Sequence, residues 1–341
     1  MTEIKRIAID TSKSVFTLHA VDDAGRAVLR RNLRRRELLP FFAKLPPVEV
    51  ALEACGGSHY WGRALLGLGH QVRLLPPQYV KPFVKRSKND RNDAEAISVA
   101  AAQPSIASVP VKSAAQQAAA MLLSVRELLV RQRTQLVNAM RGHAAEMGVV
   151  APLGEKGVRE LRHEIAVADD AAVPPPAKQA IALLSREAER IATRLRTIDA
   201  TLMQQHKTNP VSRRLAAIPG IGPIGALNFA LRVEARQFQS ARHFAAWLGL
   251  VPRQCSTAGR QRLGGISRAG DERLRQLLVL GATAVIQHAK PGRPATTQWL
   301  LNLLGRKPRK LAAVALANKM ARIVWAMMTR SEAYRPAPAA A

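Results

Sequence analysis

The sequence predicts a mixed α/β domain at the N-terminus, followed by a region of long helices and a mostly helical C-terminal part. Three observations predict this order. Three strand-like segments come in series within the first 34 residues, and two more then alternate with helix-like segments. Apolar residues repeat at heptad spacing through the middle of the chain. From residue 208 onward the pattern is helical and is interrupted by two glycine-rich loops.

The N-terminal strands are rich in apolar and β-branched residues. We expect them at Ile4–Asp10, Val15–Val21 and Ala27–Leu33, with Asp22-Asp23-Ala24-Gly25 as a hairpin turn between the second and third. The later elements are expected as a helix near Glu37–Leu45, a strand at Glu49–Glu53, a helix around His59–Leu68, a strand at Gln71–Leu75 and a helix from Asp90 to about Ala102. This order predicts a mixed sheet with helices on its faces.

Heptad spacing characterises the middle of the chain. It runs from Leu122 to Ala139, is broken by glycine and proline around 148–176, and resumes strictly from Ile181 to Leu202. The second stretch steps 3-4-3-4-3-4 through Ile181, Leu184, Ala188, Ile191, Leu195, Ile198 and Leu202. This pattern predicts a coiled-coil seam. The seam fits either a partner helix of the same chain or a second chain, and the second case would make a homo-oligomer.

The chain of 341 residues is long enough for two or three domains. We expect an N-terminal domain at 1–108, a long-helix coiled-coil region at 109–207, a helical domain at 208–330 and a disordered tail at 331–341.

The charge balance indicates a polyanionic partner. Lys and Arg number 52 against 24 Asp and Glu, which gives a formal net charge of +28. Solubility alone needs far less charge, so we expect nucleic acid. The basic clusters at 30–36 and 306–310 suit contacts with RNA or DNA backbones, and a solvated basic face is the less favoured alternative for each cluster.

Other features favour a cytoplasmic protein. The two cysteines, Cys55 and Cys255, fit no metal-site spacing and no disulfide framework. No signal peptide is recognised. No uninterrupted apolar run reaches the ~18 residues of a membrane span, because Lys319 and Arg322 interrupt the nearest candidate.

Four carboxylates stand out because acidic residues are scarce. Asp10 and Glu53 each close an apolar strand, while Asp90 and Asp93 lie three residues apart at the start of a helix and therefore on one face of it. Brought together, they would suit Mg²⁺, which prefers a few carboxylates and substrate phosphates. Three of them have an ordinary alternative: Asp90 as a helix N-cap with Asp93 at the third helical position, and Asp10 as a turn residue or part of a phosphate loop.

Two glycine-rich segments of the C-terminal half suit phosphate binding. Ile218-Pro219-Gly220-Ile221-Gly222 is typical of a helix-hairpin-helix, in which Gly220 and Gly222 would let backbone N–H groups meet a phosphate. A glycine-rich basic loop then presents Ser256 near four arginines that suit a scissile phosphate: Arg253, Arg260, Arg262 and Arg268. Taken alone, the first segment is also a plain helix connection and Ser256 a simple phosphate contact.

Together these motifs resemble the DEDD transposases of bacterial insertion sequences, of the 110 family and its 1111 group. The resemblance rests on Ile9-Asp10-Thr11-Ser12-Lys13, on 52–61 around Glu53, on 88–94 around Asp90 and Asp93, on the 218–222 hairpin and on 249–271 around Ser256. The motifs occur in the same order and cover almost the whole chain.

The resemblance implies a RuvC-like first domain of RNase H fold, in which Asp10, Glu53, Asp90 and Asp93 bind Mg²⁺. It implies that Ser256 is a nucleophile that forms a transient phosphoserine link to DNA; Thr257 stands where many relatives carry a second serine or similar small polar residue, so Ser267 is a distant alternative. It further implies a structured noncoding bridge RNA that pairs with donor and target DNA, and a dimer or tetramer with shared active sites. It also implies a bacterial protein associated with the nucleoid.

Two other functions compete with a site-specific recombinase. A RuvC-like metal-dependent nuclease or junction resolvase would hydrolyse DNA with water and tolerate loss of the Ser256 hydroxyl. A non-catalytic nucleic-acid scaffold would bind without metal and would lose no chemistry on replacement of Asp10.

Overall fold

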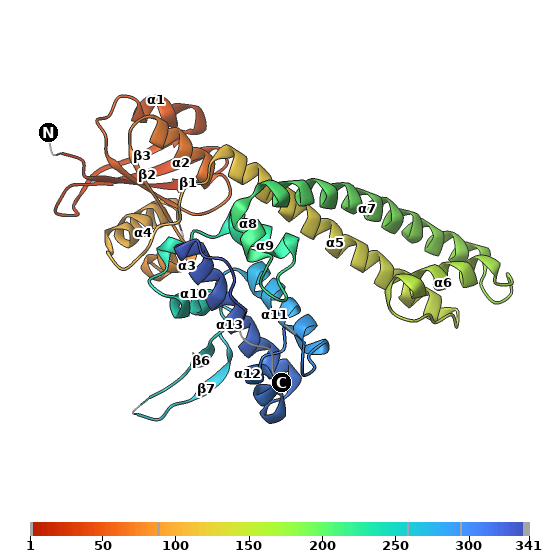
Figure 1. Cartoon of the computed structure of the whole chain (residues 1–341). Coiled ribbons are helices and arrows are strands. Elements are labelled where there is room, and N and C mark those ends of the chain that lie inside the picture. The colour runs from red at the N-terminus through yellow and green to blue at the C-terminus, as the bar shows by residue number, and fades with distance from the viewer. Residues whose placement is uncertain (1–2, 87–88, 258, 294, 337–341) are drawn as a thin grey trace. The chain divides into compact units, whose positions relative to one another are not determined.

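The protein folds into two compact units, Met1–Ala118 and Ala119–Ala341, in a computed structural model (Figure 1). The structure describes residues 3–86, 89–257, 259–293 and 295–336. Of the expected disordered tail, 337–341 lie outside the described residues, and 331–336 contain no helix or strand.

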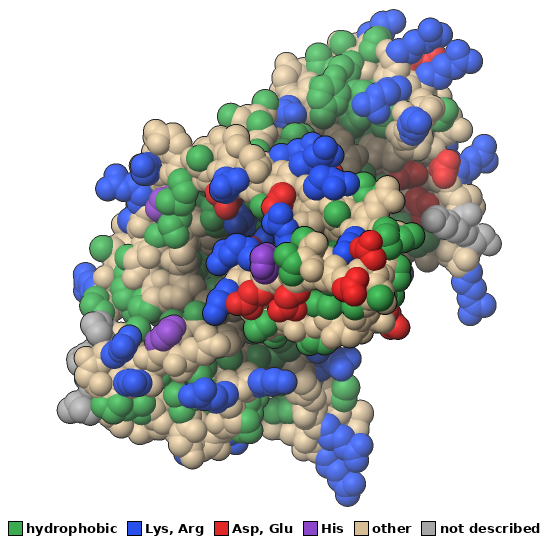
Figure 2. Space-filling model, turned by 90° about the vertical axis from the view of Figure 1, so that its right-hand side faces the viewer, with side chains coloured by type: hydrophobic (Ala, Val, Ile, Leu, Met, Phe, Trp, Pro, Cys, Tyr) green, Lys and Arg blue, Asp and Glu red, His purple; other side chains and the backbone are tan. Residues whose placement is uncertain are grey.

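The excess of positive charge lies on the surface. On the face shown in Figure 2, Lys and Arg side chains are spread over most of the visible area, and acidic side chains are fewer. The arrangement matches a chain in which basic residues outnumber acidic ones by 52 to 24.

The first unit is built on a five-stranded mixed sheet of order β3-β2-β1-β4-β5. The strands are β1 (Arg6–Thr11), β2 (Val15–Val21), β3 (Ala27–Arg34), β4 (Glu49–Glu53) and β5 (Gln71–Leu75). β1, β2 and β3 are antiparallel neighbours, whereas β4 runs parallel to both β1 and β5. The expected strands are confirmed to within two residues, and the arrangement is compatible with an RNase H-like fold.

Helices cover both faces of this sheet because alternate strand residues point to opposite sides. Ile7 and Ile9 pack with Phe42 and Trp61 of α1 (Leu38–Phe42) and α2 (Ser58–Gly67). Ala8 and Ala51 lie on the other face, where they pack with α4 (Asp90–Ala102) and with Val80 of the short α3 (Pro77–Val80). Small alanines on this face allow α4 to approach the sheet closely.

Asn89, and not Asp90, is the N-cap of α4. The Asn89 side chain accepts a hydrogen bond from the backbone N–H of Asn92 at 2.9 Å. The capping explanation of Asp90 is therefore wrong, because Asn89 already satisfies the free N–H of the first turn. Asp90 and Asp93 lie in the first turn with their carboxylates available for another role.

The second unit is helical apart from one two-stranded ribbon. Its helices are α5 (Ala114–Glu146, which begins in the first unit), α6 (Gly154–Val167), α7 (Pro175–Thr208), α8 (Pro210–Leu215), α9 (Pro223–Arg232), α10 (Ala241–Trp247), α11 (Glu272–Gln287), α12 (Gln298–Arg306) and α13 (Arg309–Arg330). The stretch 148–176, expected as a break, contains α6, so this expectation is wrong. Most of its glycines and prolines lie at the ends of that helix: Gly148 and Pro152 precede it, Gly154 and Gly157 lie in its first turn, and Pro174 is the N-cap residue of α7.

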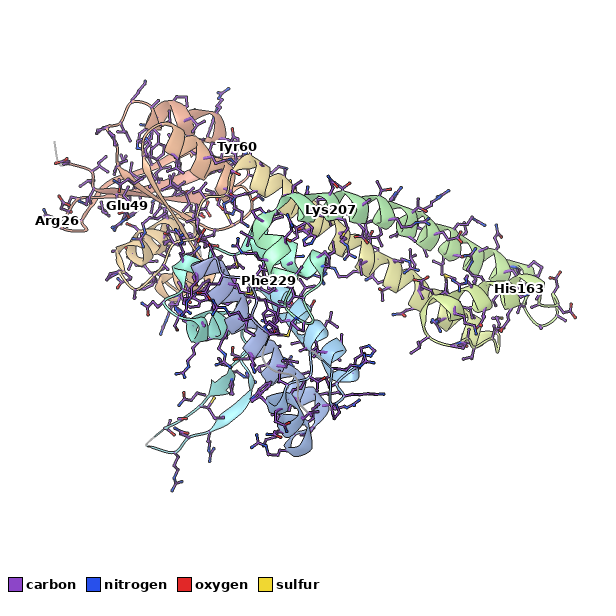
Figure 3. The ribbon with its side chains drawn as sticks, viewed as in Figure 1. Arg26, Glu49, Tyr60, His163, Lys207 and Phe229 are labelled. Carbon is purple, nitrogen blue, oxygen red and sulfur yellow. The ribbon has the colours of Figure 1, made fainter. Side chains whose placement is uncertain are left out.

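The regular apolar side of α7 packs against α5 of the same chain. Ile181 shares a cluster with Met140 and Ala144 of α5, and Leu202 shares another with Leu123. An ion pair joins Arg126 of α5 to Asp199 of α7. In Figure 3, Lys207 and His163 mark the two ends of this helical region.

The main core of the second unit surrounds α13. This helix buries seven residues, including Met320, Val324 and Met327, against a cluster that also contains Phe229 of α9 and Phe244 of α10 (Figure 3 labels Phe229). α13 is also the one helix in the described ranges that is long and apolar enough to cross a membrane by composition. Its packing in this core accounts for that apolar character.

A backbone-to-backbone contact joins α11 to the turn before α9. A Cβ atom on Gly281 would lie 1.9 Å from the carbonyl oxygen of Gly220, and Gly220 itself has a φ of +86°. We expect Gly281→Ala to lower the free energy of unfolding by about 1–3 kcal/mol, since backbone atoms must shift to admit the methyl group. Urea denaturation followed by circular dichroism measures the change.

Gly305 in α12 provides the matched control, because a Cβ there meets no atom within 4 Å. Gly305→Ala should leave stability unchanged or raise it slightly, as alanine favours a helix over glycine. Equal urea midpoints for Gly281→Ala and Gly305→Ala would contradict the close contact between Gly281 and Gly220.

Candidate functional site

Three of the four singled-out carboxylates form one group. Oxygens of Asp10, Asp90 and Asp93 all lie within 4.8 Å of one another. The fold explains the meeting: Asp10 ends β1 on the same sheet face as Ala8, and α4 packs on that face with Asp90 and Asp93 in its first turn. Residues 80 positions apart in sequence are thereby brought together.

Glu53 lies beside this group without belonging to its closest set. It ends β4, the strand parallel to β1, so its position corresponds to that of Asp10 on the neighbouring strand. Glu53 is near enough to raise the pKa of Asp10, and Asp93 in turn raises the pKa of Glu53. The four residues therefore share one electrostatic environment.

Burial and mutual repulsion raise the pKa of Asp10 to about 6. Burial is the largest cause, followed by the charges of Asp93, Asp90 and Glu53. The pKa of Glu53 is also raised, first by burial and then by Asp93. A divalent cation would relieve this repulsion, and hard carboxylate oxygens are the ligands that such a cation prefers. The donor set therefore fits a divalent metal ion.

The remaining acidic residues of the first unit are occupied in other ways. Glu95 forms an ion pair with Lys85 at 2.8 Å, and Asp22 accepts the backbone N–H of Arg26 at 2.8 Å within the β2–β3 turn. Asp23 is exposed and pairs with Lys5. The interpretation of Asp22 and Asp23 as turn residues agrees with these contacts.

Ser256 lies on a β-hairpin, where the sequence predicted only a loop. The hairpin consists of β6 (Pro252–Gln254) and β7 (Leu263–Ile266). The Ser256 hydroxyl accepts a hydrogen bond from the backbone N–H of Arg262 at 3.2 Å. The singled-out arginines of this segment are all exposed: Arg253, Arg260, Arg262 and Arg268. Ser267 lies apart at the hairpin base, where its N–H donates to the Val251 carbonyl.

Two side chains that the sequence did not single out hold the base of this hairpin. Arg275 of α11 is 8% exposed and donates to the carbonyls of Leu248 at 3.1 Å and Ala269 at 2.7 Å. Asn318 of α13 donates to the Leu250 carbonyl at 3.2 Å. In the sequence, Arg275 cannot be told from an arginine on the solvent side of a helix. Only the fold shows that it is buried and holds the hairpin base.

The two hairpin glycines near residue 220 differ in their surroundings. Gly220 faces α11 at close range, as described above, whereas a Cβ on Gly222 would meet no atom within 4 Å. Gly222 is the N-cap residue of α9, and Pro223 follows at the first helical position. Of the two, Gly222 has the more open approach for a ligand.

Two family models match segments of this chain. A family model described as a DEDD transposase of the IS110 type matches residues 7–148, which include all four carboxylates. A second model, described as transposase IS116/IS110/IS902 family, matches residues 212–298, which include Ser256. The chain belongs to this transposase family.

Similar proteins extend the relationship over nearly the full length. The transposase is 50% identical over 98% of its length to a putative transposase of Sinorhizobium fredii, covering 87% of that protein. It is 37% identical over 98% of its length to the transposase for insertion sequence element IS1111A of Coxiella burnetii, covering 92% of that protein. It is 36% identical to the transposase for insertion sequence element IS1328 of Yersinia enterocolitica, with 98% and 99% covered.

The transposase is therefore an enzyme that cuts and rejoins DNA. Membership of a DEDD family and the group of Asp10, Asp90 and Asp93 together indicate a divalent-metal site. The family recognised from sequence motifs is confirmed by both models and by the full-length relatives.

Proposed function

We propose that the transposase moves its insertion sequence through a transient phosphoserine, using Mg²⁺ held by Asp10, Asp90, Asp93 and Glu53. The observation that carries the metal assignment is the approach of three aspartate oxygens within 4.8 Å, together with an Asp10 pKa raised to about 6. Such repulsion is unfavourable unless a cation neutralises it, so the arrangement has a use only when a metal is bound.

Ser256 is proposed as the nucleophile. It lies among exposed arginines on a hairpin whose base is held by buried side chains, so a phosphate reaches the hydroxyl without disturbing the core. In the proposed step the Ser256 Oγ–phosphorus bond forms while one phosphodiester P–O bond breaks. The freed strand end, or the end of another strand, then attacks the phosphoserine in the reverse sense. Because each bond is exchanged for one of similar energy, rejoining needs no ATP.

The protein's own residues divide the remaining work. Arginines beside Ser256 would hold the phosphate oxygens through forked donors and stabilise developing negative charge. Bound Mg²⁺ would supply a lower pKa for the attacking hydroxyl and charge neutralisation at the phosphate. The backbone of the 218–222 turn would hold a further phosphate as a helix-hairpin-helix, mainly through the open side at Gly222.

Guidance by a structured noncoding bridge RNA and assembly into a dimer or tetramer complete the proposal. Both come from the family resemblance, and the basic surface of both units suits an RNA as well as DNA. Pairing of the RNA with donor and target would supply sequence choice, as in other guided systems. A coiled-coil contribution to assembly would use parts of α5–α7 beyond the pairing of α5 with α7.

The decisive experiment traps the covalent link. Purified protein, flanking-region RNA, Mg²⁺ and end-labelled donor and target DNA are mixed, and the products run on a denaturing gel before and after protease. A protease-sensitive slow band is expected from the native protein. It should be absent with Ser256→Ala and with EDTA, because the first lacks the nucleophile and the second removes the metal.

Ser267→Ala is the matched control, since Ser267 lies at the hairpin base rather than beside Arg262. It should retain the band. Cleavage with no protein-linked product would favour a nuclease or junction resolvase that uses water. Loss of the band with Ser267→Ala and not with Ser256→Ala would move the nucleophile to Ser267.

A further inference from the structure

We propose that a polar hollow beside the three carboxylates holds phosphates of the DNA strand on which they act, an inference that rests on the proposed function. The hollow has a volume of about 460 Å³ and is bounded by β2, β3 and the first turns of α4. Asp90, one of the three grouped carboxylates, lines it. The hollow and the candidate metal site therefore share Asp90.

The pairing of β1, β2 and β3 aligns polar side chains in a row that begins at the carboxylates and crosses the sheet. Asp10 of β1 pairs with Thr17 of β2, and Thr17 pairs with Asn32 of β3, so the three side chains form one row on a single face. Neighbouring strands are ~4.8 Å apart, so the row leads roughly 10 Å away from the carboxylates. The next row on this face ends in Arg30, which pairs with His19.

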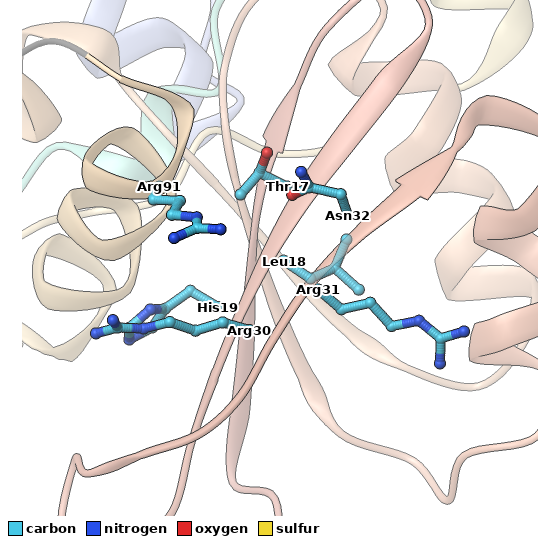
Figure 4. Close-up of a pocket in the computed structure, with 7 residues that line it drawn as sticks. All are labelled: Thr17, Leu18, His19, Arg30, Arg31, Asn32 and Arg91. Carbon is cyan, nitrogen blue, oxygen red and sulfur yellow. The ribbon is translucent and has the colours of Figure 1, made fainter.

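Figure 4 shows how these side chains lie. Thr17 and Asn32 are side by side, and Arg91 reaches toward them from α4. His19 and Arg30 lie parallel on the same side, whereas Arg31 points to the opposite side. There the Arg31 guanidinium lies over the ring of Phe41, at 5.6 Å from its centroid.

Three polar side chains of the hollow, those of Arg30, Asn32 and Arg91, are available to a ligand. Among the residues that the structure describes, Arg91 has no ion-pair partner, and the Asn32 side chain has no hydrogen bond. Arg30 lies 3.9 Å from Glu95, but the charge of Glu95 is shared with Lys85, which is closer at 2.8 Å. Both arginines can therefore meet an anion entering from the metal site.

The lining favours a nucleic-acid backbone over a base or a small metabolite. Arginine, asparagine and threonine are among the residues that contact phosphate oxygens and sugars without reading sequence. The residues that line the hollow include no Phe, Tyr or Trp on which a base could stack. At the ~3.4 Å rise per nucleotide of duplex DNA, the ~10 Å row accommodates about three nucleotides.

Binding measurements with paired arginine variants test the proposal. Fluorescence anisotropy follows the full-length protein with labelled element-end DNA in Mg²⁺ over a range of NaCl. Arg30→Gln with Arg91→Gln should weaken binding about tenfold at low salt and reduce the log–log salt slope by about 1–2, since each arginine neutralises about one phosphate. The matched control is Arg31→Gln with Arg35→Gln, which removes two arginines that lie over Phe41 and Trp61.

Neutral methylphosphonate linkages, placed one at a time along the strand, locate the contact. In the native protein, and in the control pair, neutralising two or three consecutive phosphates should weaken binding. In the protein that carries both Arg30→Gln and Arg91→Gln, neutralising the same phosphates should not weaken binding. Identical scans for the two variant pairs would overturn the proposal, and so would an effect seen only with an RNA strand of the same sequence.

The same scan separates this inference from the proposed chemistry. In Asp10→Asn, a methylphosphonate at the phosphate that contacts the metal should no longer weaken binding. The phosphates held by the hollow should lie within about three nucleotides of that position. If no phosphoserine forms but the arginine-dependent positions persist, the hollow stands and the serine mechanism fails. If phosphoserine forms normally and no position depends on the arginines, the hollow fails alone.

Discussion

Replacing Asp10 by Asn is expected to abolish strand cleavage and, at the same time, to make the metal-free protein more stable. The loss follows from removing a central oxygen ligand of the group formed with Asp90 and Asp93. The gain follows from the raised pKa of Asp10, about 6, which is caused by burial and then by the charges of Asp93, Asp90 and Glu53. At neutral pH the native carboxylate carries an unfavourable charge that the amide lacks.

The pH dependence has a definite sign. The folded pKa of Asp10 is about 6 and the ordinary value is 3.8, so the folded state binds the proton more tightly. Stability of the metal-free protein therefore falls as pH rises from about 4 to about 6 and then levels off. The advantage of Asp10→Asn should be on the order of 1–2 kcal/mol at pH 7.5, after allowance for solvent screening of a half-buried group, and should vanish near pH 4.

Thermal denaturation in EDTA and in Mg²⁺ measures both effects. In EDTA the melting temperature of Asp10→Asn should be higher than that of the native protein. In Mg²⁺ this difference should become smaller or change sign, because only the native protein gains ligand stabilisation. Asp23→Asn is the control, since Asp23 is an exposed turn residue paired with Lys5. If Asp10→Asn melts at a lower temperature than the native protein in EDTA at pH 7.5, the inferred repulsion between Asp10 and its neighbouring carboxylates is refuted.

Arg275→Met is expected to reduce phosphoserine formation much more than its loss of stability explains. Arg275 is buried and donates to carbonyls on both sides of the hairpin, at Leu248 and Ala269. Methionine fills similar space but leaves these acceptors without a donor, at a cost of about 2–4 kcal/mol. The two ends of the segment that carries Ser256 then lose their common anchor, so we expect at least a tenfold slower covalent step.

Gly281→Ala serves as the stability-matched control, because it destabilises the same unit without touching the hairpin base, and saturating DNA removes any effect of this variant on phosphate binding at the 218–222 turn. The rate of phosphoserine formation is compared at a temperature where both variants are folded by circular dichroism. Arg275→Lys, which restores one donor, should recover part of the rate. Equal rates for Arg275→Met and Gly281→Ala would reduce Arg275 to a purely structural residue.

Much of the first unit was predictable because its signals are local. Apolar segments bounded by polar turns gave the five strands and the helix from Asp90 to Ala102. The carboxylates were recognised because acidic residues at strand ends are unusual in a chain with so few of them. The alternative interpretation of Asp90 as the helix cap was wrong because Asn89 and Asp90 are both good caps, and only backbone geometry decides between them.

Features that depend on contacts between distant segments were not predictable. The row from Asp10 through Thr17 to Asn32 requires the register of three strands, and the support of the hairpin by Arg275 and Asn318 requires the packing of two helices. The hairpin around Ser256 was read as a loop because its strands are only three and four residues long and rich in glycine and arginine. The helix at Gly154–Val167 was missed because glycines in its first turn and prolines on both sides of it hid its short apolar pattern.

The anchoring of the hairpin has an evolutionary consequence. Arg275 and Asn318 grip it only through main-chain oxygens, at Leu248, Leu250 and Ala269. Any amino acid supplies such an oxygen, so the side chains farther out along the ribbon are free to diversify without unfolding the protein. Selection for a different DNA or a different rate can therefore act on the tip of the hairpin while the scaffold beneath it stays the same.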